Sequence, residues 1–173
     1  RREHLRRCGR RHRAFARHML VVAGLMDRLY ARQVGMEALS SRVERADTAS
    51  MSLFHRNWGA RCLASTTETD PACSPIDGAP HQHVDVYPDA LQGDDGAFCA
   101  VLEARPDASA LLSPFVVVRE REGALAAVPY TTAYAELTQP IAAELRAAAD
   151  AMTDPAETAL VAYLRAAATS FET

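Results

Sequence analysis

Apolar side chains recur along residues 14–33 at alternating spacings of four and three, and charged side chains lie on or near the opposite face. This is the period of an amphipathic helix, so the segment is predicted to form the first clear helix. Its predicted buried stripe is Phe15, Met19, Val22, Met26 and Leu29. Gly35 is predicted to end this element, because glycine accepts the left-handed conformation that closes a helix.

A second, shorter helix is predicted over residues 36–46. Its inward-facing side chains are Met36, Leu39 and Val43. From residue 59 to about residue 95, prolines and glycines break any period, which predicts a long ordered loop or several short extended pieces. A loop of this length is uncommon inside a compact domain unless it is functional or stapled. A short helix is predicted over residues 97–103.

Two short apolar runs around Glu122-Gly123 predict a β-hairpin over residues 115–128. Helical spacing then resumes, and two antiparallel amphipathic helices are predicted over residues 132–172. Pro140 is predicted either to start the regular part of the first helix or to kink it. The side chains predicted to face inward from that helix are Tyr134, Leu137, Ile141, Leu145, Ala148 and Met152.

The last predicted helix has the clearest start signal. Asp154 can cap it, Pro155 fits its first position, and Glu157 completes a capping box. Its predicted buried stripe is Leu160, Tyr163, Leu164, Ala167 and Phe171. The chain stops in the last turn of this helix and begins with Arg1 rather than methionine, so both ends are expected to be cuts.

These elements predict an α+β fold that is mainly α-helical. In chain order it comprises N-terminal helices, an irregular Pro-rich segment, a β-hairpin and an antiparallel helix pair. Residues 1–13 are predicted to be an Arg-rich flexible start. Residues 14–173 are predicted to be one α-rich domain or part of a lobe, since this length can bury a substantial core.

The net charge of −3 conceals a strong asymmetry. Residues 1–61 hold fourteen arginines against five acidic residues, and residues 62–173 hold five against seventeen. A basic end of this kind can bind nucleic acid or acidic lipid, but a solvated or partner-facing surface is the commoner cause, so nucleic-acid binding is not expected. The chain has no lysine and much alanine, which indicates a GC-rich, bacterial gene. No stretch reaches the roughly 20 apolar residues that span a bilayer, so no membrane segment is expected.

Cys62 and Cys73 flank ten residues of the Pro-rich segment. A disulfide there would stabilise the fold by about 3 kcal/mol in the chain-entropy model. It would also indicate an oxidising compartment, so a periplasmic or secreted location is slightly favoured over a cytoplasmic one. Two reduced thiols are the alternative, and the residues alone leave both open.

His81 and His83 would point to one side of an extended strand. Their spacing from the two cysteines does not match zinc modules, whose ligands come in close pairs, so they are predicted to be loop histidines without a metal. Asp94-Asp95 fit a solvated turn better than a catalytic pair. No phosphate-binding loop, nucleophile elbow or His-Glu-x-x-His helix occurs, so no catalytic or metal-binding residue is predicted in the chain.

Four stretches resemble the N-terminal part of dipeptidyl peptidase III-like proteins of the bacterial branch. They are LMDRLYARQVG, FHRNWGARC, VDVYP, and PFVVVREREGALAAVPYTTAY with the two Ala-rich helices behind it. Together they cover about residues 15–173. The resemblance implies a zinc-dependent peptidase with two lobes around a wide cleft, which removes dipeptides from the N-terminus of short peptides.

In such a peptidase the zinc sits on a helix with His-Glu-x-x-His, or a version one residue longer, and the Glu of the motif acts as general base on the zinc-bound water. A further Glu follows downstream. None of these residues occurs here, so the resemblance implies the N-terminal, non-zinc lobe or a fragment of it, inactive alone, with the zinc motif beyond the chain end. Asn57 and Gly59 are the positions it nominates for the substrate cleft, and a helix-ending turn is their other interpretation.

The partners expected are the rest of the parent polypeptide and, in the full-length protein, a peptide substrate. An alternative function is a self-contained α-helical binding module whose Arg-rich N-terminus meets an acidic partner. That module would bind in a salt-dependent way. A small enzyme of another class is the third possibility.

Overall fold

The computed structural model shows an α+β fold that is mainly α-helical, which confirms the predicted fold class. The residues that it describes are 9–43, 47–62, 64–67, 70, 72–76, 84–92 and 98–173, without the side chains of residues 10, 11 and 57. Contacts group the chain into two compact units: Arg1–Leu29 with Tyr130–Thr173, and Tyr30–Pro129. This grouping does not test the prediction that residues 14–173 form one domain or part of a lobe, which stays a prediction.

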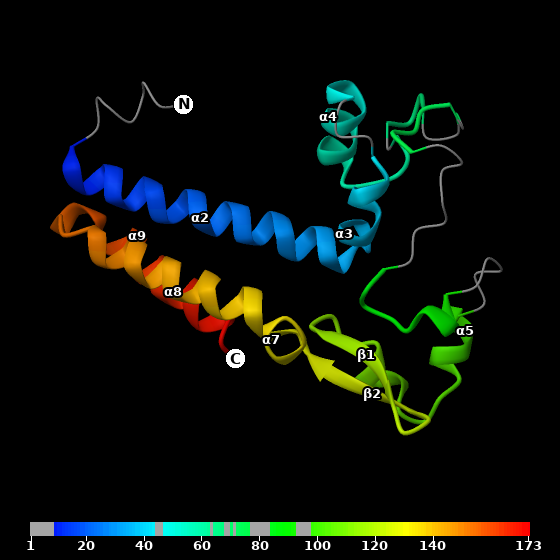
Figure 1. Ribbon diagram of the computed structural model, residues 1–173. Coiled ribbons are helices and arrows are strands. Elements are labelled where there is room, and N and C mark those ends of the chain that lie inside the picture. The colour runs from blue at the N-terminus through cyan, green and yellow to red at the C-terminus, as the bar shows by residue number, and fades with distance from the viewer. Residues whose placement is uncertain are drawn as a thin grey trace. The chain divides into compact units, whose positions relative to one another are not determined.

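The first unit contains most of the long helix α2 (Arg10–Gln33), followed at the other end of the chain by α7 (Tyr130–Ala133), α8 (Ala135–Ala151) and α9 (Thr158–Ser170). The helices α8 and α9 lie side by side (Figure 1). α2 begins at Arg10, earlier than the predicted residue 14, because arginine is a good helix former. Residues 1–8 of the Arg-rich start lie outside the described residues.

The core of this unit is a cluster of small and branched apolar side chains. Every side chain predicted to face inward from α8 and its flanks is buried: Tyr134, Leu137, Ile141, Leu145, Ala148 and Met152. Val22 of α2 and Leu164 and Ala168 of α9 pack into the same cluster as Ile141. Fully burying a side chain such as Ile141 contributes about 2 kcal/mol, so this cluster is the main support of the helix pair.

Two positions of the predicted stripes are exposed instead. Met26 is 47% exposed and Tyr163 is 68% exposed, so their assignment to the buried face is wrong. On α2 the cluster is contacted by Leu25 and Leu29. On α9 the buried side is centred on Leu164, and Tyr163 comes one residue earlier, about 100° around the helix.

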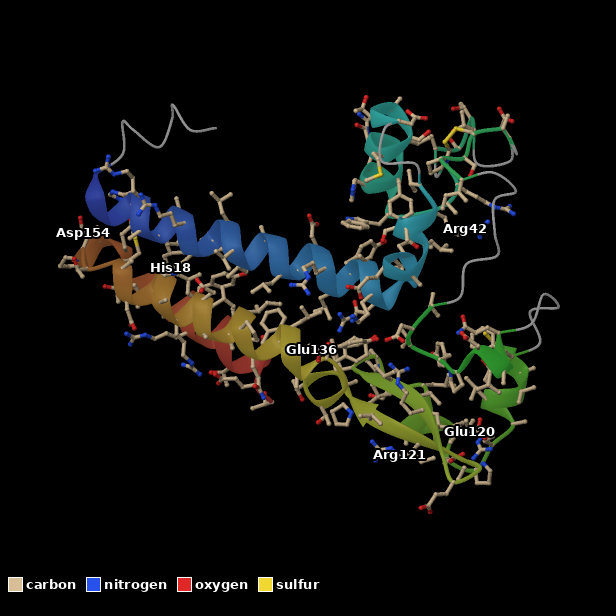
Figure 2. All side chains as sticks on the ribbon, in the orientation of Figure 1. His18, Arg42, Glu120, Arg121, Glu136 and Asp154 are labelled. Carbon is tan, nitrogen blue, oxygen red and sulfur yellow. A yellow bond between two sulfur atoms is a disulfide. The ribbon has the colours of Figure 1, made fainter. Side chains whose placement is uncertain are left out.

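The connection between α8 and α9 contains the predicted cap. The Asp154 carboxylate accepts a hydrogen bond of 2.9 Å from Ala156 N, and Pro155 begins the short 3₁₀ helix η3 (Pro155–Glu157) that leads into α9. Figure 2 shows Asp154 at this turn. α8 begins at Ala135 and runs through Pro140, so Pro140 does not start the helix. The irregular residue is Tyr134, between α7 and α8.

The second unit begins with the end of α2, α3 (Met36–Leu39) and the 3₁₀ helix η1 (Ser40–Arg42). The helix predicted over residues 36–46 is therefore too long, because Val43 already has extended backbone angles. The reason lies in Ser40 and Ser41, whose hydroxyls donate to the carbonyls three residues earlier and compete with regular helix bonding. Met36 and Val43 are buried, and Leu39 packs against them, as predicted.

The β-hairpin is confirmed, with β1 (Val116–Arg121) antiparallel to β2 (Ala124–Pro129). Its register pairs Val116 with Pro129 and Arg121 with Ala124, so the hairpin starts and ends one residue later than predicted. Glu122 and Gly123 both have positive φ, 53° and 78°. That geometry matches the right-handed twist of the strands and closes a two-residue turn.

The remaining elements pack on the hairpin or follow α3. They are α4 (Thr48–Asn57), the 3₁₀ helix η2 (Asp89–Leu91), α5 (Phe98–Glu103) and α6 (Ala108–Leu111). Leu102 of α5, Leu111 of α6 and Val118 of β1 form one buried cluster. The helix predicted over residues 97–103 is thus present as α5, whereas α6 was not predicted. Within the described residues, no helix is both long and apolar enough to cross a membrane.

Candidate functional site

The two cleft positions nominated by resemblance lie at the end of α4, so this helix and the turn behind it are the candidate site. α4 starts at a well-formed cap, in which the Asp47 carboxylate accepts hydrogen bonds of 3.0 Å from Ala49 N and Ser50 N. The Ser50 hydroxyl donates to the same carboxylate at 2.7 Å. This hydroxyl, and then the backbone N–H of Ser50, hold the pKa of Asp47 below its ordinary value.

α4 ends at Trp58, whose backbone adopts the left-handed conformation with φ 40° and ψ 52°. For a residue with a Cβ this conformation costs about 1–2 kcal/mol, so the surroundings must hold it. The Trp58 ring meets the Phe54 ring edge-on at a centroid distance of 6.2 Å and the His55 ring at 5.0 Å. Phe54 is buried and His55 is exposed. The Trp58 ring therefore contacts the core through Phe54 and a surface side chain through His55.

Asn57 is the last residue of α4, and Gly59 follows Trp58 in a buried position. The structure describes the backbone of Asn57 and not its side chain. Both residues are therefore in the turn that ends the helix, and their role in a substrate cleft stays a prediction. Ala60, directly after them, is buried in the cluster that contains Met36, Val43, Phe54 and Ile76.

A disulfide between Cys62 and Cys73 closes the segment behind this turn, with a Cα–Cα distance of 5.6 Å (Figure 2). Cys62 N donates to Cys73 O at 3.0 Å beside it. The Ser74 hydroxyl oxygen lies 2.5 Å from Ala60 O and 2.6 Å from Ile76 O, and it accepts from Ile76 N at 3.1 Å. One hydroxyl proton serves one carbonyl at a time, so Ser74 ties Ala60 to Ile76 through a shared bond.

A second polar network, not found from the sequence, fixes residues 84–87, which form a turn rather than the expected extended piece. The Gln92 amide donates to Val84 O and Tyr87 O at 2.8 Å each, and it accepts from Val84 N at 2.8 Å. Asp85 pairs with Arg119 of β1, Nη2 to Oδ2, at 2.9 Å. The only sequence signal was the VDVYP stretch. Nothing in it indicates that Gln92, a few residues away, or Arg119, 34 residues away, would bind there.

Metal-binding chemistry is not built into the part of the chain that the structure describes. Within that part, no three His, Cys, Asp or Glu side chains gather as a group that could hold a metal ion. His81, His83, Asp94 and Asp95 lie outside the described residues. The described side chains therefore do not fit a zinc site, and no catalytic step is assigned to them.

Comparison with known proteins gives one informative similarity. No family model matches the sequence, and no curated protein matches it. Among solved structures, the chain is similar to DPP III from Caldithrix abyssi, with a TM-score of 0.74 and 23% sequence identity. The match covers 95% of this chain and 31% of that one. It shows that the chain has the fold of a part of DPP III, and that it spans about a third of that protein's length.

Proposed function

We propose that this chain is scaffold of a bacterial zinc-dependent dipeptidyl peptidase similar to DPP III, in the N-terminal lobe that does not hold the zinc. The observation that carries the proposal is the match of 95% of the chain to part of DPP III. The four sequence stretches that resemble the family support it independently, because they run through both units and include the hairpin and α8. The expected partners are the rest of the parent polypeptide and a peptide substrate.

Zinc chemistry belongs to another part of the longer protein in this proposal. The described residues offer no group of donors for zinc, and the family's zinc motif, His-Glu-x-x-His or its longer form, is absent from the chain. What this chain contributes is a folded support, with Asn57 and Gly59 as its nominated contacts with the cleft. Bound zinc would supply an activated water, and that chemistry is not routed through any residue of this chain.

The disulfide supports a periplasmic or secreted location for the parent protein, because structural disulfides persist in oxidising compartments. This part of the proposal is independent of the peptidase activity. It is tested by localising the full-length protein in cell fractions. Recovery in the cytoplasmic fraction, with both thiols reduced, would contradict it.

The peptidase proposal is tested with the full-length gene product. Short peptides are incubated with it, and the products are identified by mass spectrometry. We expect dipeptides released stepwise from the N-terminus, and loss of release when the Glu of the downstream zinc motif is replaced by Gln. A gene that encodes no zinc motif after Thr173, or a chain that binds nucleic acid in a salt-dependent way and cleaves nothing, would favour the binding-module alternative.

A further inference from the structure

The disulfide between Cys62 and Cys73 joins two points of the chain that are eleven positions apart. The described main-chain hydrogen bonds of the segment between them are local turns, such as Thr67 N to Ala64 O at 2.8 Å and Asp70 N to Thr67 O at 3.1 Å. Among the described residues between the two cysteines (64–67, 70 and 72), no helix or strand forms. Three described contacts hold the two ends of this segment together: the disulfide, the Cys62 N–Cys73 O bond next to it, and the Ser74 hydroxyl that ties Ala60 to Ile76. The disulfide is the covalent one among them.

The same closure supports the end of α4. Ala60 precedes Cys62 by two residues and Ile76 follows Cys73 by three, and both are buried in the cluster that contains Phe54. Trp58 packs against this cluster in its left-handed conformation. A strained backbone of this kind persists only while its surroundings hold it, so loosening the loop removes part of what holds Trp58.

The two cysteines of the disulfide differ in exposure. Cys62 is buried, with 6% of its surface exposed, whereas Cys73 is half-buried. A thiolate of a small dithiol attacks the sulfur of Cys73, and the S–S bond breaks with Cys62 leaving as a thiolate that takes up a proton. The second thiol of the reductant then displaces Cys73 from the mixed disulfide. The protein gains two thiols and two electrons, and the dithiol becomes a cyclic disulfide.

We propose that the Cys62–Cys73 disulfide is a redox-sensitive latch for the Trp58–Gly59 turn. When a dithiol reduces it, the covalent link between Cys62 and Cys73 is lost, the packing of Ala60 and Ile76 loosens, and Trp58 leaves the left-handed conformation. The helix pair α8–α9 keeps its structure, because its core belongs to the other unit and contains no residue of this segment. The inference does not rest on the peptidase proposal.

Trp58 makes this latch directly measurable, because it is the sole tryptophan of the chain. The experiment uses the 173-residue chain with Cys8→Ser and Cys99→Ser, so that thiol counting reports on Cys62 and Cys73 alone. Dithiothreitol is added, free thiols are counted, and the Trp58 emission is recorded. We expect two thiols to appear, the emission to shift to longer wavelength, and oxidation to restore the original spectrum.

Hydrogen exchange distinguishes a disulfide that controls only the Trp58–Gly59 turn from one that stabilises the whole chain. On reduction we expect exchange to become roughly tenfold faster or more over residues 48–62, with α8 and α9 unchanged. The Cys62→Ser/Cys73→Ser variant is the matched control, which should show the reduced spectrum and no response to the dithiol. The proposal is overturned by any of three results: no thiol release, thiol release without a change at Trp58, or loss of protection in α8–α9 together with the loop.

Discussion

His18 of α2 and Glu144 of α8 are in direct contact, with Nδ1 of the imidazole 2.7 Å from Oε2 of the carboxylate. Figure 2 shows His18 on the side of α2 that faces α8. The two residues are 126 positions apart, and each side chain is about one-third exposed. This pair therefore joins the beginning of the chain to its C-terminal helices at the border of the apolar cluster that includes Val22 and Ile141.

Breaking this pair should cost little stability, because both side chains are partly exposed and water competes for their contact. In a double-mutant cycle of His18→Ala and Glu144→Ala, we expect a coupling free energy of about 0.5 kcal/mol. Urea unfolding followed by far-ultraviolet circular dichroism measures it. A coupling near zero would mean that the apolar cluster alone holds α2 to α8.

Two neighbouring residues of α9 should differ sharply in their effect on stability. Leu164→Ala should lower the free energy of unfolding by about 3 kcal/mol, because Leu164 is buried and its removal leaves a cavity. Tyr163→Ala is the matched control, since Tyr163 is 68% exposed and its loss should cost about 0.5 kcal/mol or less. Equal losses in the two variants would contradict the assignment of the buried face.

The hairpin turn offers a stabilising substitution. Glu122 has a φ of 53°, a conformation that asparagine tolerates better than glutamate. Glu122→Asn should therefore raise the free energy of unfolding by about 0.5 kcal/mol. Glu120→Asn, in the exposed part of β1, is the control and should give no gain. If the two variants behave alike, the left-handed turn is not what limits stability.

Acid should destabilise the chain through three carboxyl groups whose pKa values are lowered in the fold. The Ser50 hydroxyl lowers the pKa of Asp47, the Arg105 guanidinium lowers that of Asp107, and the Arg146 guanidinium lowers that of Glu172. Each group binds its proton more weakly when folded, so the unfolded chain takes up protons first. The stabilisation is complete above the unfolded pKa values near 4 and is lost as pH falls through the folded values.

The urea midpoint should accordingly be flat around neutral pH and fall below about pH 4. Glu172→Gln is an informative variant, because it removes the charge that pairs with Arg146 at 2.5 Å and keeps the shape of the side chain. In this variant the urea midpoint should fall less steeply with decreasing pH than in the parent chain. A slope identical to that of the parent chain would show that this ion pair does not contribute.

Local patterns predicted the elements whose packing is regular. The apolar stripe of α8 was predicted completely, because six positions at helical spacing face one cluster. Asp154 was predicted as a cap because the donors it satisfies are within two residues of it. Glu122-Gly123 likewise indicated its turn, since the conformation needed there is set by the two residues themselves.

What could not be predicted depends on three-dimensional contacts that no periodic pattern of the sequence indicates. Gln92 is one polar residue in a loop, and nothing near it indicates that its amide binds the backbone at Val84 and Tyr87. Tyr163 fits an apolar stripe by spacing, yet the position of the neighbouring helix leaves it exposed. The left-handed Trp58 contradicts its own local preference, and packing on Phe54 and His55 holds it.

Zinc stoichiometry tests most directly the proposal that this chain is scaffold and that the chemistry lies elsewhere in the protein. Metal content is measured on the full-length gene product and on the 173-residue chain after the same exhaustive dialysis. We predict one zinc per full-length molecule and none retained by the 173-residue chain. One tightly held zinc on the shorter chain, lost with His81→Ala and His83→Ala, would contradict the proposal.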